Sequence, residues 1–433
     1  MQGSNSSRAG TCWYNTDSMK QHTDFPEGFL WGASTAAHQV EGSTHNQWSE
    51  WELANAGRLA ATFTKRLHWL PNLAEVTHAG TDPANYISGR GVEHYERYRE
   101  DFGILQQLGM NAFRFSIEWS RVEPEEGKWD EQAIAHYREY ISELKKRNIE
   151  PVLTLWHWTM PVWFTAKGGF ERQGNVAYFV RYARKMGELF GSDVRYIITL
   201  NEPNVYMMFG YLVGEWPPQS KNPLRALAVY YNLVLAHRRA YRVLKRVLPN
   251  VHVGVAMSLS NVVPSNPQNT LNVLSVRVAS YAWNYWFLDR IRKIQDFIGV
   301  NYYATTYRGM FVADHPRRPK SDLGWSMEPK MIERVLVDTW QRYGAPLMVT
   351  ENGLADAHDA HRRWWLEETF VGLQAAMAQG VKLRGYLHWS LLDNFEWAYG
   401  WWPKFGLVEV DRATMKRTIR PSARWFAERI KKL

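Results

Sequence analysis

The sequence of 433 residues predicts a single (β/α)₈ barrel, and three observations lead to this fold class. Short segments rich in β-branched and aromatic residues alternate with amphipathic helical stretches, which is the pattern of a parallel sheet. There are eight such segments, the number that closes a barrel. Neither a fixed-period repeat nor a Pro/Gly/Ser-rich linker divides the chain, so one large domain is favoured. A doubly wound open sheet is the weaker alternative.

The expected strands are spread along the whole chain. They are residues 29–34, 112–117, 151–155, 196–200, 251–256, 297–301, 346–350 and 383–389. The helices between them show apolar residues at three-to-four spacing, as expected for one buried helix face. Before the second strand this face consists of Tyr95, Tyr98, Phe102, Leu105 and Leu108, and before the third of Ile134, Tyr137, Ile141 and Leu144.

The first 23 residues differ from the rest of the chain, and the barrel is expected to occupy residues 24–433. They are polar and lack the basic and apolar regions of a secretory signal, so we expect a loose tail. No run approaches the roughly 18 apolar residues of a membrane-spanning helix, so no membrane partner is expected. The single cysteine, Cys12, cannot form an internal disulfide, which favours a reducing compartment such as the cytoplasm.

The charge distribution argues against nucleic-acid binding, whereas the aromatic content suits sugar binding. The 52 basic and 43 acidic residues give a formal net charge of +9, but the basic residues are scattered over helical stretches such as 238–246. Nucleic-acid binding needs a concentrated basic stripe on a recognised module, so no nucleic acid is expected as a partner. Many of the 22 tryptophans stand at strand ends, where their faces can stack on sugar rings.

Two short segments each place one carboxylate where an apolar run stops. In TLNEPN, Pro203 favours an extended backbone at Glu202 and suits the first position of a following helix. In VTENG, Glu351 is followed directly by an Asn-Gly turn signal. Either glutamate alone is as easily a surface residue at a strand exit. The two matching contexts make them candidate halves of an acid/base pair.

A barrel gathers its catalytic groups just past the carboxyl ends of its strands. Polar and aromatic residues stand at these positions in the expected elements. They are Gln39, His157, Trp158, Asn201, Glu202, Tyr303, Glu351 and Trp389. Taken singly, His157 is more often a packed histidine and Gln39 a loop amide. Their joint placement predicts one pocket.

Three longer strings carry a resemblance to a known family. They are FPEGFLWGA followed by QVEG in the first expected unit, RFSIEWSR in the second, and HWSLLDNFEW in the eighth. At these strings and at both glutamate motifs, the chain resembles glycoside hydrolase family 1, the retaining β-glucosidases and their relatives. The resemblance covers nearly the whole chain. It implies the eightfold barrel, no cofactor, and β-glycosides or short β-linked oligosaccharides as substrates.

The resemblance also implies roles for four residues. Glu202 matches the acid/base of the family and Glu351 its nucleophile. Arg114 matches the arginine that pairs with the nucleophile, and Tyr303 is expected to hydrogen-bond it, so both favour its charged form. The charge of Glu351 then raises the pKa of Glu202 until a glycosyl ester neutralises Glu351. Carboxyl groups about 5–5.5 Å apart would give a product that keeps its β configuration.

Further matches fall on sugar-binding positions of the family. The expected substrate-binding residues are Gln39, His157, Trp158, Asn201, Asn301, Trp325, Trp389, Glu396 and Trp397. Within this set Asn201 matches the partner of the sugar 2-hydroxyl and Trp325 an aglycone-side tryptophan. The pair Glu396 and Trp397 predicts an unphosphorylated glycone, because a carboxylate repels phosphate.

One connection departs from the family pattern. After Asp289 the family spends a few dozen residues before its sixth strand, whereas here Asp296 and the strand follow almost at once. Either this loop is short, which would lower one wall of the aglycone side and loosen this edge of the barrel, or a segment is missing from the sequence.

Two other classes of function are weaker. A catalytically silent carbohydrate-binding protein could use the same barrel, but the presence of both glutamates argues against it. A metalloenzyme is weaker still, because the 14 histidines include no His-x-x-x-His or His-x-His pair at a strand end. The preferred glycone and aglycone, the balance of hydrolysis and transglycosylation, and the oligomeric state are not determined by the sequence.

Overall fold

The structure is a computed structural model that describes residues 25–309 and 318–433. The predicted tail, residues 1–23 with Cys12, lies outside these ranges. The barrel strands are β1 (Leu30–Ser34), β2 (Ala112–Ser116), β3 (Glu150–Thr154), β4 (Tyr196–Asn201), β5 (His252–Ser258), β7 (Phe297–Asn301), β9 (Leu347–Asn352) and β10 (Leu383–Trp389). All eight predicted strands are confirmed, with ends that differ by no more than two residues.

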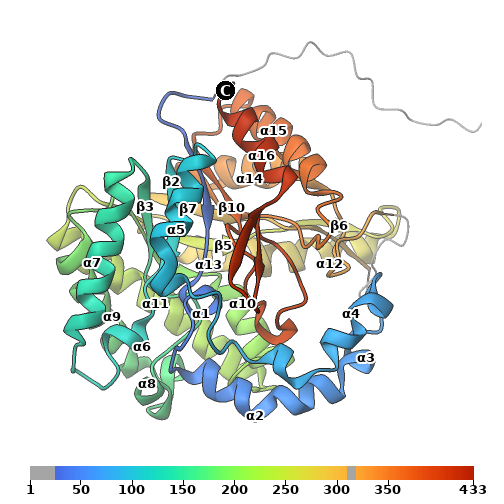
Figure 1. Cartoon of the computed structure of the whole chain (residues 1–433). Coiled ribbons are helices and arrows are strands. Elements are labelled where there is room, and N and C mark those ends of the chain that lie inside the picture. Colours follow the sequence, from blue (N-terminus) through green and yellow to red (C-terminus); the bar gives the residue numbers. More distant parts are fainter. Residues whose placement is uncertain (1–24, 310–317) are drawn as a thin grey trace, which may run out of the picture.

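These strands close into a ring in the order β1-β10-β9-β7-β5-β4-β3-β2, and helices surround them (Figure 1). Every neighbouring pair is parallel. The predicted (β/α)₈ barrel is therefore confirmed, and the open-sheet alternative is wrong. Two small sheets lie outside the ring. They are β6 (Asn261–Pro264) with β8 (Thr305–Arg308), and β11 (Val408–Asp411) with β12 (Lys416–Ile419).

The helices vary widely in length. The longer ones are α2 (Gln47–Ala61), α5 (His94–Gln107), α7 (Glu131–Lys146), α9 (Val176–Phe190), α11 (Pro223–Val247), α12 (Thr270–Ser280), α14 (Ile332–Tyr343), α15 (Arg362–Ala378) and α16 (Pro421–Ile430). The shorter ones are α1 (Ala37–Val40), α3 (Phe63–Arg66), α4 (Leu73–Gly80), α6 (Trp119–Val122), α8 (Val162–Ala166), α10 (Pro203–Met207) and α13 (Trp286–Ile291). Two π-helical segments, η4 (Met208–Val213) and η5 (Tyr281–Tyr285), continue α10 and α12. Within the described residues, no helix is long and apolar enough to cross a membrane.

The predicted apolar helix faces are buried against the barrel. Helix α7 begins where the Asp130 carboxylate accepts hydrogen bonds from the backbone of Gln132 and Ala133, a cap that stabilises a helix by about 1 kcal/mol. Its buried face includes Ile134, Tyr137, Ile141 and Leu144, as predicted. In α5, Phe102 packs edge-on against Phe113 of β2, with ring centroids 5.7 Å apart. The helix faces that cover the barrel are therefore largely those that the spacing of apolar residues predicts.

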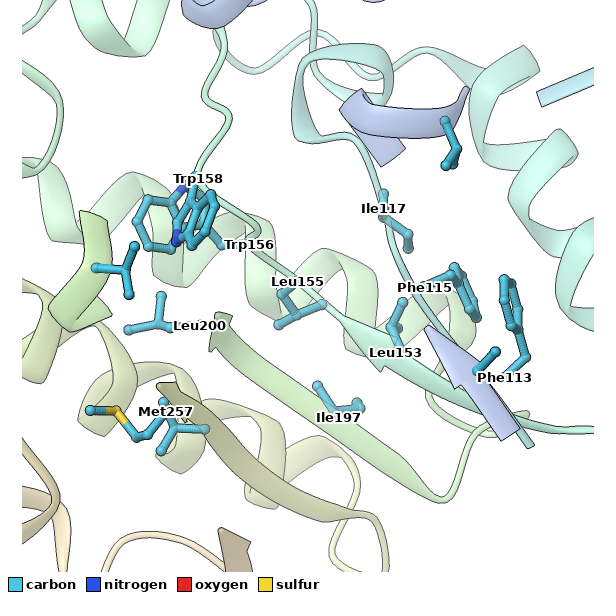
Figure 2. Close-up of a cluster of buried hydrophobic side chains, with 14 of the residues drawn as sticks. Phe113, Phe115, Ile117, Leu153, Leu155, Trp156, Trp158, Ile197, Leu200 and Met257 are labelled. Atoms are coloured by element: carbon cyan, nitrogen blue, oxygen red, sulfur yellow. The ribbon is translucent and has the colours of Figure 1, made fainter. Parts of the chain in front are cut away.

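Successive residues of the barrel strands face opposite sides. Figure 2 shows part of the outer layer, in which Phe113 and Phe115 of β2 lie beside Leu153 of β3 and Ile197 of β4. A second apolar cluster fills the interior, mostly near the amino ends of the strands. It consists of Leu30, Ala112, Val152, Tyr196, Ile198, Ala256, Phe297, Met348 and Leu387. The carboxyl end of the barrel is therefore left for polar side chains.

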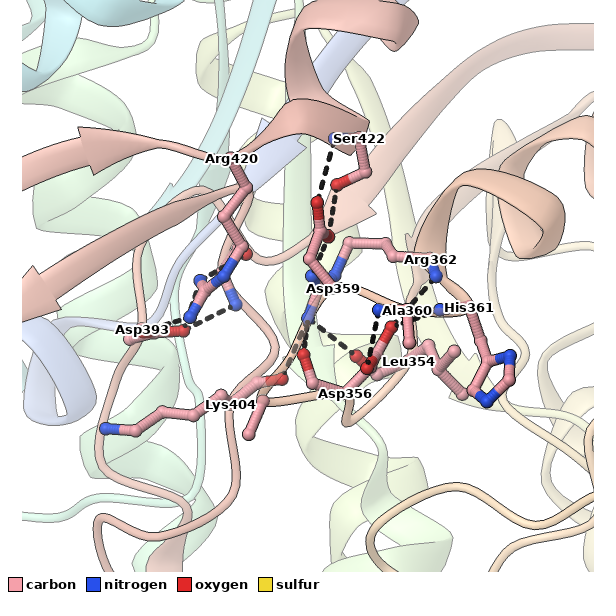
Figure 3. A network of polar contacts seen from close by, with 12 residues as sticks. Leu354, Asp356, Asp359, Ala360, His361, Arg362, Asp393, Lys404, Arg420 and Ser422 are labelled. Atoms are coloured by element: carbon pink, nitrogen blue, oxygen red, sulfur yellow. Dashed lines mark hydrogen bonds and ion pairs between the residues drawn. The ribbon is translucent and has the colours of Figure 1, made fainter.

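The loops that follow β9 and β10 and the start of α16 are linked by buried ion pairs and hydrogen bonds (Figure 3). Arg420 donates two hydrogen bonds of 2.9 Å to the Asp393 carboxylate. Arg362 donates to the backbone carbonyl of Lys404 at 3.0 Å. Removing one partner of a buried ion pair typically costs about 3–5 kcal/mol, because the other charge is left uncompensated. This network holds the loop 390–407, which carries two of the predicted substrate-binding residues.

Candidate active site

A pocket of about 360 Å³ lies at the carboxyl ends of the barrel strands. Its wall contains nine of the predicted site residues, from the ends of five barrel strands: His157, Trp158, Glu202, Tyr303, Trp325, Glu351, Trp389, Glu396 and Trp397. The other four, Arg114, Gln39, Asn201 and Asn301, are buried and hydrogen-bond residues of the wall or of its loops. The volume is within the range of small-molecule sites.

Glu351 lies near the end of β9 and is held on both carboxylate oxygens. Arg114 donates to Oε1, and the Tyr303 hydroxyl donates to Oε2 at 2.6 Å. The remaining donors of the guanidinium bind Thr154 Oγ1 at 3.0 Å and Asn201 Oδ1 at 2.6 Å, so its position is fixed. Burial, and then the charge of Glu351, raises the pKa of Tyr303 well above its usual value, so the phenol keeps its proton and donates. The Glu351 carboxylate is therefore held in one position by a donor on each oxygen.

Glu202 follows β4 and is buried in the same pocket. Asn301 Nδ2 donates to its Oε1 at 2.9 Å. Burial, and then the charge of Glu351, raises the pKa of Glu202 well above its usual value, while Asn301 and Arg114 lower it. From the sequence only the charge of Glu351 is expected to raise this pKa, whereas in the structure burial is the larger cause. These effects favour the protonated form of Glu202 in the empty pocket.

The prediction of an extended backbone at Glu202 is wrong, because its φ of 41° and ψ of 60° are left-handed. Its N–H donates to the carbonyl of Ala256 at 2.8 Å, and its own carbonyl accepts from Val205 and Tyr206. These bonds join β4 to β5 and to the first turn of α10. Pro203 occupies the first position of that helix, as predicted. A proline disfavours only the right-handed helical region at the preceding residue, so the left-handed conformation remains accessible.

The protonation of His157 follows from its neighbour Asn201. Asn201 Oδ1 accepts from Arg114 at 2.6 Å and from Asn301 at 3.2 Å, so its Nδ2 is the donor to His157 Nε2 at 3.0 Å. Burial lowers the pKa of His157 well below its usual value, so the ring is neutral. Its proton is then on Nδ1, which makes this atom a donor.

Three predicted sugar-binding residues have buried polar atoms without a hydrogen-bond partner among residues 25–309 and 318–433. They are Gln39 Oε1, His157 Nδ1 and Glu396 Oε2. The amide nitrogen of Gln39 donates to Asn394 Oδ1 at 2.9 Å and to the carbonyl of Phe395 at 2.7 Å, so its oxygen is the free end. Buried polar atoms are rarely left unpaired, and these match the alternating donors and acceptors of a polyol.

Aromatic rings cover the same part of the pocket. The imidazole of His157 lies nearly parallel to the rings of Trp389 and Trp397, at centroid distances of 5.8 and 6.1 Å. The indole N–H of Trp158 donates to the carbonyl of Asn201 at 2.9 Å, which leaves its apolar surface for contacts. Trp158 and Trp397 both have positive φ, and such backbone strain is concentrated at functional sites.

The side-chain amide of Asn301 is fully engaged with neighbouring protein groups. Both N–H groups of its amide are engaged, one with Glu202 and one with Asn201, and its oxygen accepts from the Thr350 hydroxyl at 2.6 Å. No donor remains for a substrate. In the empty pocket Asn301 therefore holds Glu202, and its contact with the sugar stays a prediction.

Twelve further residues of the pocket wall were not predicted from the sequence. They are Val205, Phe209, Glu215, Trp216, Ser258, Leu259, Ser260, Trp283, Ala304, Thr306, Tyr399 and Phe405. Phe209 and Trp283 come from the two π-helical segments, whose extra residue per turn re-aims a side chain. Apolar periodicity cannot reveal such segments, so no local signal marked these two residues.

The comparison with known proteins agrees with this geometry. The model of glycosyl hydrolase family 1 matches residues 21–295 and 289–433, which together cover nearly the whole chain.

The chain belongs to glycosyl hydrolase family 1.

Relatives of this family 1 hydrolase match over almost their whole length. Beta-glucosidase A of Thermotoga maritima is 31% identical, over 94% of this chain and 98% of the relative. Among solved structures, the β-glycosidase of Pyrococcus horikoshii is 36% identical with a TM-score of 0.81, covering 93% of this chain and 94% of the other. The T. maritima β-glucosidase in complex with glucoimidazole is 29% identical with a TM-score of 0.83, covering 94% and 98%. This family 1 hydrolase thus shares both sequence and fold with glycosidases.

The short connection of this family 1 hydrolase lies where its two matched segments meet, at residues 289–295. The barrel nevertheless closes across it, since β7 pairs directly with β5. Asp289 accepts two hydrogen bonds from Arg342, at 3.0 and 2.7 Å, and Asp296 accepts from Tyr241 and Lys245. Both ends of the connection are therefore anchored by hydrogen bonds.

Proposed function

We propose that this family 1 hydrolase is a retaining β-glycosidase that releases terminal, unphosphorylated β-D-glycosyl residues. β-Glucosides are its main substrates, and β-galactosides and β-fucosides are further ones. The observation that carries this proposal is the pairing of two differently held carboxyl groups in one pocket. Glu351 is anchored by Arg114 and Tyr303, whereas Glu202 is kept protonated by burial and by the charge of Glu351. Two carboxyl groups in different ionisation states are what glycoside cleavage requires.

In the first step Glu351 attacks the anomeric carbon while Glu202 gives its proton to the departing oxygen. The glycosidic C–O bond breaks and an ester forms on Glu351. This ester is neutral, so it no longer raises the pKa of Glu202. Glu202 then takes a proton from water, the water oxygen attacks the anomeric carbon, and the ester bond breaks. Two inversions at the same carbon restore the β configuration.

The free polar atoms of the pocket suit the hydroxyl groups of a hexose. Gln39 Oε1 can accept, His157 Nδ1–H can donate, and Glu396 can bind two neighbouring hydroxyls, while Trp389 and Trp397 supply apolar faces. Asn201 retains one N–H beyond the one given to His157, which allows the expected bond to the 2-hydroxyl.

The wall also supports an unphosphorylated glycone. Burial, and then the charge of Glu351, raises the pKa of Glu396 to about 8. Near neutral pH this carboxyl is therefore largely uncharged in the empty pocket, so its repulsion of a phosphate group is too weak to exclude phosphorylated sugars by itself. The stronger argument is that no Lys or Arg lines the described part of the pocket wall to bind a phosphate.

A catalytically silent sugar-binding protein is the alternative, and the two opposed hydrogen-bond environments of Glu202 and Glu351 speak against it. A binding protein needs neither an anchored nucleophile nor a protonated partner beside it. The lack of any possible internal disulfide supports our proposal that the enzyme works in the reducing cytoplasm.

A panel of nitrophenyl β-glycosides tests the proposed substrates. We expect hydrolysis of the β-glucoside, weaker hydrolysis of the β-galactoside and β-fucoside, and at least about 100-fold lower kcat/KM for the 6-phospho-β-glucoside. Proton NMR of the first product should show the β anomer before mutarotation. An α anomer as first product would contradict the retaining mechanism. A preference for the phosphorylated glucoside would contradict the proposed glycone.

A further inference from the structure

Strand β9 carries one extra residue beside the nucleophile candidate. Val349 pairs with Val300 of β7, and Glu351 pairs with Asn301, so Thr350 forms a β-bulge between the two pairs. A bulge interrupts the alternation of side chains, and bulges near active sites re-aim side chains. Thr350 and Glu351, although consecutive, therefore both present polar atoms to the site.

The Thr350 side chain fits a space that a glycine leaves open. A Cβ atom at Gly299 would lie 2.8 Å from Thr350 Oγ1 and 3.0 Å from its Cγ2. Both distances are too short for ordinary contacts, so a larger residue would displace the hydroxyl. The hydroxyl donates to Asn301 Oδ1 at 2.6 Å. The bulge thus directs the Thr350 side chain toward Gly299, and the absence of a Cβ atom at Gly299 leaves room for its hydroxyl.

This hydroxyl, together with the acceptor Asn201 Oδ1, sets which way the Asn301 amide points. With its oxygen bound to Thr350, the amide turns its nitrogen toward Glu202 Oε1, at 2.9 Å, and toward Asn201 Oδ1, at 3.2 Å. Because Oε1 accepts this bond, the transferable proton of Glu202 is left on Oε2. The opposite amide orientation would place its oxygen against Glu202 and would tie up that proton.

We propose that Thr350 is a positioning residue for the acid/base: its hydroxyl fixes the Asn301 amide so that Glu202 accepts a hydrogen bond on one oxygen and keeps its proton on the other. The inference rests on the proposed role of Glu202. Through Thr350, strand β9, which carries Glu351, would influence how Glu202 gives and takes its proton.

The charged and titratable groups around Glu202 determine the direction of the expected effect. Glu351 on β9 and Glu396 on the β10 loop raise its pKa, and Arg114 on β2 lowers it. Tyr303 stays protonated and His157 stays neutral. The Asn301 hydrogen bond also lowers the pKa of Glu202. Loss of that bond should therefore raise it.

The test is the pH dependence of kcat/KM for 4-nitrophenyl β-glucoside in Thr350→Val, which replaces the hydroxyl by a methyl group of similar size. On the alkaline side of the profile, kcat/KM falls as Glu202 loses its proton; we call this fall the basic limb. We expect its midpoint to rise by about one pH unit, because the Glu202 carboxylate loses its hydrogen bond from Asn301. Thr350→Ala removes the hydroxyl without adding bulk and should show the same shift if Thr350→Val does not fold. Thr350→Ser keeps the hydroxyl and should retain the wild-type limb.

Thr199→Val is the matched control, since this equally buried threonine of β4 bonds His237 at 2.7 Å and does not contact Glu202. Its basic limb should stay in place. An unshifted limb in Thr350→Val and Thr350→Ala would overturn the proposal, as would an equal shift in Thr350→Ser. A basic limb that persists in Glu202→Gln would instead contradict the proposed function, and the role of Thr350 with it.

Discussion

Replacing Glu351 with glycine should abolish hydrolysis, with kcat lowered by about 10⁴-fold or more, because no group remains to form the glycosyl ester. The substitution leaves a small cavity beside Arg114 and Tyr303, which both donated to the lost carboxylate. A small anion such as azide or formate can occupy this cavity and meet the same donors. It should restore turnover of an activated aryl glycoside and give a product of inverted, α configuration.

The folded state must be checked in this variant, because the buried guanidinium of Arg114 loses its counter-ion and the free energy of unfolding falls. Circular dichroism and thermal unfolding in the presence of the anion provide that control. Rescue with inversion by a glycine variant of Glu202, and not of Glu351, would mean that the two roles are exchanged. Wild-type turnover without the anion would show that Glu351 is not the nucleophile.

Replacing Glu202 with alanine should have an effect that depends on the leaving group. A poor leaving group needs the proton, so we expect kcat/KM for alkyl β-glucosides to fall by about 10³–10⁴-fold. A dinitrophenolate departs without a proton, so the corresponding glycoside should lose far less in kcat/KM. Steady-state kinetics over a series of leaving groups measures this slope.

The pH dependence of kcat/KM should also change in Glu202→Ala. The wild-type kcat/KM should fall as the pH rises through the raised pKa of Glu202, because the acid form is the active one. This basic limb should vanish in Glu202→Ala. A uniform loss over all leaving groups, with the limb retained, would assign the acid to another residue.

The strands and the two glutamates could be predicted because their signals are local. Each barrel strand is a short apolar run with turn residues after it, and each glutamate stands at the end of such a run. The buried helix faces of α5 and α7 were likewise visible in the spacing of their apolar residues. These features depend on neighbours in the chain, which the sequence displays directly.

Features that depend on contacts between distant segments could not be predicted. The left-handed backbone of Glu202 is set by a hydrogen bond to Ala256 on the next strand, which overrides the extended tendency before proline. The contact of Asn301 with Glu202 and the register shift at Thr350 arise only when β7 pairs with its neighbouring strands. Phe209 and Trp283 reach the pocket through π-helical turns that leave no periodic pattern.

The central claim is that Glu351 forms a covalent bond to the sugar. It is tested most directly by treating the protein with 2,4-dinitrophenyl 2-deoxy-2-fluoro-β-D-glucoside, whose fluorine slows the breakdown of the ester more than its formation. Mass spectrometry of the intact chain and of its peptides should show one added fluoroglucosyl group on the peptide that contains Glu351, with one equivalent of dinitrophenol released. An unlabelled chain that still hydrolyses the parent glucoside, or a label on another residue, would contradict the account.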